Sequence, residues 1–172
     1  RAGVWWWGTL GGVLIAKAIW AVSVPLVFSG DGVEYAVNAA ALHETGTMGP
    51  VNAWRMPGYS VMLAMGLHLL PLAGVVGVMH VALGVLTAAG AGALARRVAP
   101  AWVAPVVMVV VGMDPVGLMY ERMVLTETLT GCALVVGVWM AVLAVEAAGW
   151  WRACGWVLGY QLIYAGRIFP GI

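Results

Sequence analysis

The sequence has very few charged residues: Asp, Glu, Lys and Arg together make up 9% of its 172 residues. A water-soluble domain is roughly one quarter charged, because a surface that faces water needs polar groups. Hydrophobic residues account for 63% of the chain, and its mean hydropathy is +0.99. The shortage of charge therefore excludes a water-soluble globular domain. It indicates an integral membrane protein, for which the bilayer is the solvent.

Basic tracts, paired cysteines and nucleotide-binding loops are also missing. The formal net charge is +1 with no basic tract, so the sequence predicts no nucleic-acid partner. Cys132 and Cys154 both lie inside apolar runs, where we expect small packing residues rather than a disulfide or a metal pair. The chain contains no phosphate-binding glycine loop and no nucleophile elbow, so soluble nucleotide chemistry has no support.

Long apolar runs are what the chain has in abundance. A helix needs about 20 apolar residues to cross a bilayer. Five runs are long enough, or nearly so, at 4–28, 73–95, 101–119, 124–147 and 150–169. The run at 58–72 is too short, because its roughly 15 helical residues do not span a hydrocarbon core of about 30 Å. We predict an all-α, polytopic transmembrane bundle, one domain over 1–172, with an outer loop at 29–72 whose short helices lie along the membrane.

The Lys and Arg count barely separates two orientations of this bundle, one with the 58–72 run along the membrane and one with it across; the length of that run favours the first. Arg96, Arg97 and Arg152 fall at turns on the same side as Arg1, which we expect to be cytoplasmic. Every acidic residue except Glu146 then falls on the opposite side. The unusual polar residues are therefore expected to gather near one outer surface, which is more than a passive membrane anchor needs.

The first outer loop begins with Asp31, directly after the first apolar run. Asp31 and Glu34 have the spacing of a helix capping box, with the acid at the N-cap and Glu at N3. A carboxylate held at the membrane surface is also a candidate catalytic group, and both interpretations stay open. Arg55, just before Pro57, suits a rigid kink that points a guanidinium at a phosphate; the alternative is an arginine that reaches lipid headgroups.

The second outer turn leads to Glu127, at the start of an otherwise apolar run. An acid there costs about 2–3 kcal/mol and usually faces a cavity or a partner. We expect Arg122 or Lys17 to be that partner; the alternative is an acid stabilised by the helix dipole. Asp114, before Pro115, is expected to form a turn.

The remaining polar residues are less informative. Arg167, at the outer end of the last run, is a candidate phosphate ligand or a plain interface anchor. His43, His68 and His80 lack the spacing of a zinc site, and we expect His80 to be a hydrogen-bonded packing residue.

Three stretches of the chain carry a family resemblance. They are Asp31-x-x-x-Tyr35-x-x-x-Ala39 followed by Arg55-x-Pro57-Gly58-Tyr59, then Pro115 with Tyr120-x-Arg122-x-x-x-Thr126-Glu127, and finally Gly155-x-x-x-Gly159 with Arg167. In order and spacing they resemble the first outer loop, the second outer motif and the fifth span of GT-C membrane glycosyltransferases. The most similar subgroup is the bacterial relatives of protein mannosyltransferases and aminoarabinose transferases. The resemblance covers only the N-terminal portion of such an enzyme, so we expect the chain to be a fragment.

The resemblance implies transfer of a sugar from a polyprenyl-phosphate carrier to an acceptor, on the outer face of the bacterial cytoplasmic membrane. Asp31 would be the catalytic base that activates the acceptor hydroxyl, or would position that hydroxyl. Glu127 would be a second catalytic-site carboxylate that orients the site. The donor phosphate would be bound by Arg55, Arg122 and Arg167, and the substrates would be positioned by Glu34, Tyr35, Tyr59 and Tyr120. In members that use a divalent cation, Asp31 and Glu127 would hold Mg²⁺ or Mn²⁺, which prefer oxygen ligands.

Two other classes of protein fit the same composition. A transporter or flippase would use Lys17 and Glu127 to line a substrate path. It predicts an inverted repeat or broken helices at matching positions, and the sequence shows neither. A non-catalytic membrane subunit predicts that Asp31 and Glu127 tolerate neutral substitution.

Overall fold

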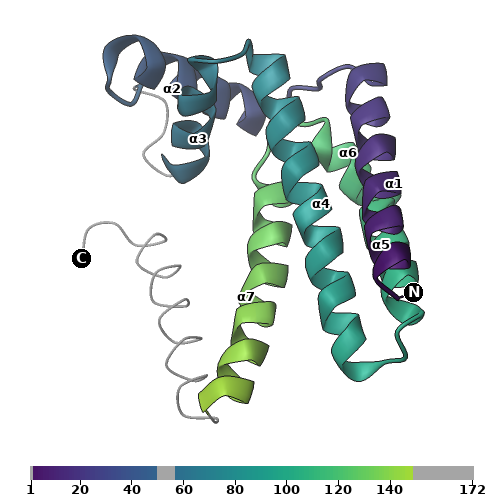
Figure 1. Cartoon of the computed structure of the whole chain (residues 1–172). Coiled ribbons are helices and arrows are strands. Elements are labelled where there is room, and N and C mark those ends of the chain that lie inside the picture. The colour runs from purple at the N-terminus through teal and green to yellow at the C-terminus, as the bar shows by residue number, and fades with distance from the viewer. Residues whose placement is uncertain (1, 50–56, 149–172) are drawn as a thin grey trace. The chain divides into compact units, whose positions relative to one another are not determined.

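The computed structural model describes residues 2–49 and 57–148 (Figure 1). Over these ranges the chain contains seven helices and no strand. The helices are α1 (Ala2–Ser23), α2 (Gly30–Thr45), α3 (Pro57–Leu67), α4 (Leu72–Val98), α5 (Val103–Gly112), α6 (Pro115–Glu121) and α7 (Glu127–Ala148). The predicted all-α class is confirmed for the described residues.

The chain divides into two compact units, Arg1–Cys132 and Ala133–Ile172. The first unit contains α1 to α6 and the start of α7, and all the site geometry described below lies within it. The described part of the second unit, 133–148, is the remainder of α7.

Two described helices are long and apolar enough to cross a membrane: α4, and α7 over Glu127–Glu146. The α5–α6 pair makes a third if it is counted as one bent span. These helices agree with a membrane protein, while the number of five spans stays a prediction. The 22 residues of α1 are sufficient in length, but its tryptophans, glycines and Lys17 lower its hydropathy. The predicted run at 150–169 lies outside the described residues.

Prolines set the boundaries that differ from the predicted runs. The first helix ends at Ser23 rather than near residue 28, because Pro25 lacks an N–H and disfavours helix at the residue before it. The predicted single run at 101–119 is two helices, α5 and α6, bent by 49° at the break. Pro115 causes this break for the same reason and begins α6 at a position where its missing N–H is not needed.

The first loop contains two short helices, as predicted. Neither α2, with 16 residues, nor α3, with 11, is among the helices that meet the length and apolarity needed to cross a membrane. They pack against each other and against the start of α4 around Tyr35, Tyr59, Leu63 and Val76, which are all buried. This packing fixes the first loop to one end of the bundle.

Small residues let α1, α4 and α5 pack closely. A Cβ added at Gly112 of α5 would lie 2.7 Å from Val13 Cγ1 of α1. A Cβ at Gly92 of α4 would lie 2.9 Å from the Met108 sulfur of α5. Glycine at helix interfaces allows this close approach, as is common between membrane helices.

The two ends of this three-helix group have different chemistry. At one end the Arg96 guanidinium lies over the Trp6 ring, 5.3 Å from its centre, so the start of α1 meets the end of α4. At the other end lie α2, α3 and the α6–α7 turn (Figure 1). The candidate catalytic groups that the structure describes belong to this second end or to the pocket just inside it.

Candidate functional site

A pocket of about 410 Å³ lies among the helices of the first unit. Five helices line it, and so does the break between α5 and α6. Its polar lining residues are Lys17, Thr87, Asp114, Tyr120, Glu121, Glu127 and Thr128. Glycines of α4, α6 and α7 and two valines of α5 complete the wall. A concave apolar wall with a few convergent polar groups is the usual form of a small-molecule site.

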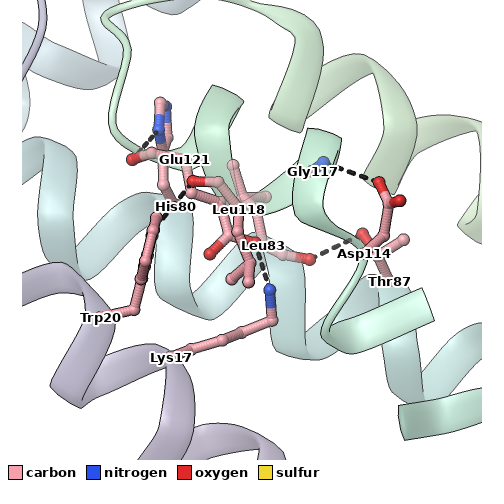
Figure 2. A network of polar contacts seen from close by, with 9 residues as sticks. All are labelled: Lys17, Trp20, His80, Leu83, Thr87, Asp114, Gly117, Leu118 and Glu121. Carbon is pink, nitrogen blue, oxygen red and sulfur yellow. Dashed lines mark hydrogen bonds and ion pairs between the residues drawn. The ribbon is translucent and has the colours of Figure 1, made fainter. Parts of the chain in front are cut away.

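A buried ion pair forms one wall of the pocket. Lys17 Nζ of α1 donates to Glu121 Oε1 at the end of α6, and the two residues are 2% and 4% exposed (Figure 2). The pair rests on Gly84 of α4, where an added Cβ would lie 2.8 Å from Lys17 Nζ. Glycine at this position therefore makes room for the two charges between α1, α4 and α6.

Two buried polar atoms beside this pair have no hydrogen-bond partner among the described residues. They are Glu121 Oε2 and Thr128 Oγ1, and both residues line the pocket. A buried acceptor without a partner costs about 1–3 kcal/mol, and more when the group is charged. Both atoms therefore lack the hydrogen-bond partner that a buried polar atom usually has.

His80 of α4 ties the pocket to the first loop. Its Nδ1 lies 3.0 Å from the main-chain oxygen of Glu121, and its Nε2 lies 2.9 Å from Tyr59 Oη. Because a carbonyl oxygen only accepts, Nδ1 carries the proton and donates to Glu121 (Figure 2). In the neutral ring Nε2 then accepts from the Tyr59 hydroxyl. The prediction that His80 is a hydrogen-bonded packing residue is confirmed.

Tyr35 and Tyr59, two of the predicted substrate-positioning residues, are buried in the packing of α2 against α3. Their rings meet edge to face at 5.1 Å, and they are 5% and 1% exposed. Burial, then the neighbouring Tyr35 and Glu127, raise the pKa of Tyr59 far above its ordinary value, so this phenol keeps its proton. The two rings hold the first loop in place.

Asp114 caps the helix that carries the ion pair. Its Oδ2 accepts from Gly117 N at 2.7 Å, which satisfies one of the free N–H groups at the start of α6 (Figure 2). The predicted turn-forming role is therefore confirmed. Its carboxylate is exposed and lines the pocket.

The predicted capping role of Asp31 is wrong. The N-cap of α2 is Ser29, whose hydroxyl accepts from Gly32 N at 3.1 Å. Asp31 lies two residues after this cap, in the first turn of the helix, and is exposed, while Glu34 is half-buried. The error comes from placing the start of the helix at the acid, when Ser29 two residues earlier is as good a cap.

The predicted partners of Glu127 are also wrong. Lys17 pairs with Glu121, and Arg122 is buried with its Nε donating to Val24 O at 2.8 Å. Glu127 is exposed in the first turn of α7, where the helix dipole favours a negative charge. It lines the pocket together with the half-buried Tyr120.

The structure brings the two motifs that were predicted to lie on the outer side against each other. Val27 donates its N–H to Arg122 O at 2.7 Å, and Val27 pairs with Met123 in an isolated parallel bridge. A Cβ on Gly32 of α2 would lie 2.8 Å from Val124 O, so the helix that carries Asp31 touches the segment that leads into Glu127. Asp31 itself does not line the pocket.

Some predicted site residues cannot be placed. Arg55 and Arg167 lie outside the described residues. In the described part of the chain, no group of three or more His, Cys, Asp or Glu residues is arranged to hold a metal ion. The proposed Asp31–Glu127 metal pair therefore has no third ligand of these types within residues 2–49 and 57–148.

The residue that the sequence analysis missed is Glu121. A signal was available, because Lys17 in the middle of an apolar run needs an acid and Glu121 lies inside the second motif, between Tyr120 and Arg122. What the sequence did not give is the bend at Pro115, which turns Glu121 toward α1.

Comparisons of this chain with protein families, with curated proteins and with solved structures found no match.

Proposed function

We propose that the chain is part of a membrane glycosyltransferase that moves a sugar from a polyprenyl-phosphate carrier to an acceptor. The observation that carries the proposal is the contact between the two outer motifs, made at Val27–Met123 and Gly32–Val124. These segments are about 90 residues apart in the sequence, and each carries an exposed carboxylate in the first turn of a helix. This proximity supports a site built from both motifs, as the resemblance to GT-C enzymes implies.

In this proposal Asp31 accepts the proton of the acceptor hydroxyl as its oxygen attacks the anomeric carbon of the sugar. The bond between that carbon and the phosphate oxygen breaks, and the carrier phosphate leaves with the bonding electron pair. Asp31 suits the role because it is exposed at the first turn of α2. Glu127, across the contact between the motifs, would orient the acceptor.

The arginines would stabilise the departing phosphate. Arg122 is fixed by its bond to Val24 O, which leaves any phosphate contact to its other guanidinium nitrogens. Tyr120 lines the pocket and would contact a substrate, while Tyr35 and Tyr59 would act indirectly by holding α2 against α3. Glu34, half-buried in the same helix as Asp31, completes the proposed site.

The test compares the native full-length protein with Asp31→Asn in liposomes, measuring sugar release from a panel of polyprenyl-phosphate sugars. A general base contributes roughly 10²–10⁴ in rate, so turnover should fall by about 100-fold or more. The matched control is Glu44→Gln, which neutralises an exposed carboxylate at the far end of the same helix and should leave turnover unchanged. Normal turnover by a folded Asp31→Asn protein would exclude Asp31 as the base.

A transporter is the second candidate, and two observations favour it. The α5–α6 pair is a broken helix, and the buried Lys17–Glu121 pair lines a pocket between helices. Broken helices and charged groups within the membrane are common at transport sites. If native protein releases no sugar from any donor but moves a lipid-linked sugar across liposomes, transport replaces glycosyl transfer as the function.

A further inference from the structure

The pocket has more negative than positive groups. Its charged lining residues are Lys17, Asp114, Glu121 and Glu127, which is one ammonium for three carboxyl groups. Lys17 is occupied by Glu121, so the carboxylates of Asp114 and Glu127 have no cation within the pocket lining. The field inside the pocket therefore favours a cation and opposes an anion such as phosphate.

The buried polar atoms without partners indicate which chemical groups a ligand of this pocket should carry. Glu121 is 4% exposed, it lines the pocket, and its Oε2 has no donor among the described residues. Thr128 Oγ1, on the α7 side of the pocket, is also buried and has no hydrogen-bond partner among the described residues. A ligand that supplies N–H or O–H donors would satisfy both atoms, since a carboxylate oxygen can only accept.

The arrangement of the acids argues against an inorganic cation. A bound Mg²⁺ or Ca²⁺ needs several oxygen ligands at about 2.0–2.6 Å from one point. Within the described ranges no three His, Cys, Asp or Glu side chains converge in that way. A larger cation reaches separate acceptors across the pocket, and a volume of about 410 Å³ is within the size range of small-molecule sites.

We propose that this pocket binds a small organic ammonium compound that also carries hydroxyl groups. Its ammonium group contacts one of the carboxylates of Asp114, Glu121 and Glu127 and is attracted by the other two across the pocket. Its hydroxyl groups bond to Thr128 and to the neighbouring Thr87 and Tyr120. The proposal does not depend on glycosyl transfer, because it rests on the charge and the polar atoms of the pocket alone.

The test measures binding of two probes to the full-length protein in nanodiscs. Serinol and glycerol share a three-carbon skeleton and two hydroxyl groups, and differ in carrying an ammonium or a hydroxyl group at the middle carbon. Serinol should bind roughly tenfold more tightly than glycerol, because hydrogen bonds to charged groups are the stronger ones. Equal affinity for the two probes, or displacement of serinol by equimolar inorganic phosphate, would overturn the proposal.

Two variants locate the bound serinol. Asp114→Asn keeps an N-cap residue of similar strength at α6 while removing one charge. This variant should therefore fold and bind serinol several-fold more weakly. Glu121→Gln removes the negative charge beside Lys17; if that protein does not fold, Thr128→Val tests the other atom without a partner. Glu44→Gln, outside the pocket, is the control. Serinol affinity that is unchanged in Asp114→Asn and in the second folded variant would place the site elsewhere and refute the proposal. Because the readout is binding, it is independent of whether the protein transfers a sugar.

Discussion

The carboxylates at the α6–α7 end of the molecule are of two kinds, and they differ in what stabilises their charge. Glu121 is 4% exposed, and its charge is stabilised by Lys17 in the space that Gly84 leaves beneath the pair. Asp31 and Glu127 are exposed in the first turns of α2 and α7, where free main-chain N–H groups favour a negative charge. The buried acid therefore holds helices together, while the two exposed acids lie where a substrate can reach them. Substitutions should separate these roles.

The largest effect should come from Lys17→Met. It leaves the Glu121 carboxylate buried without its cation, and breaking a buried pair in this way typically costs about 3–5 kcal/mol. The free energy of unfolding of the full-length protein in detergent would measure the loss. Adding Glu121→Gln should recover part of it, because the isolated charge is then gone. If Lys17→Met unfolds like the native protein, the pair does not stabilise the bundle.

A smaller loss should follow Gly84→Ala. The new methyl group would lie 2.8 Å from Lys17 Nζ and displace the pair, and overpacking of this kind costs about 1–3 kcal/mol. Gly11→Ala in α1 is the matched control, because a Cβ there meets nothing within 4 Å. Thermal unfolding of the two variants side by side gives the comparison. Equal melting temperatures would mean that the ion pair has room to move away from α4.

The smallest effects should separate the cap of α2 from its exposed acid. Ser29→Ala removes the hydroxyl that accepts from Gly32 N and should cost about 1 kcal/mol. Asp31→Asn removes the charge of an exposed acid in the first turn, where a negative charge is worth about 0.3–1 kcal/mol. Denaturant unfolding should therefore rank Ser29→Ala as the more destabilised variant, whereas Asp31→Asn should lose far more activity. The reverse ranking of stability would restore Asp31 as the cap.

The sequence predicted the elements that depend on composition and length. The long apolar helix α4 and the two short helices of the first loop were predicted correctly, because the length of an apolar run decides whether a helix can cross a bilayer. The sequence showed that Lys17 needs an acid, but it did not show which one, because the bend at Pro115 brings Glu121 to it. The cap of α2 was mistaken for a similar reason, since Ser29 and Asp31 are both good caps and only the main-chain geometry separates them.

The contact between α1 and α6 has a consequence for the biogenesis of the protein. Lys17 and Glu121 are 104 positions apart, so the acid does not yet exist when the lysine leaves the ribosome. At synthesis rates of about 5–20 residues per second, the interval is roughly 5–20 s. During that interval the ammonium group of α1 has no counter-ion from its own fold. The first helix must therefore wait at the insertion machinery, or sit shallow in the bilayer with its lysine reaching water, until α6 is made.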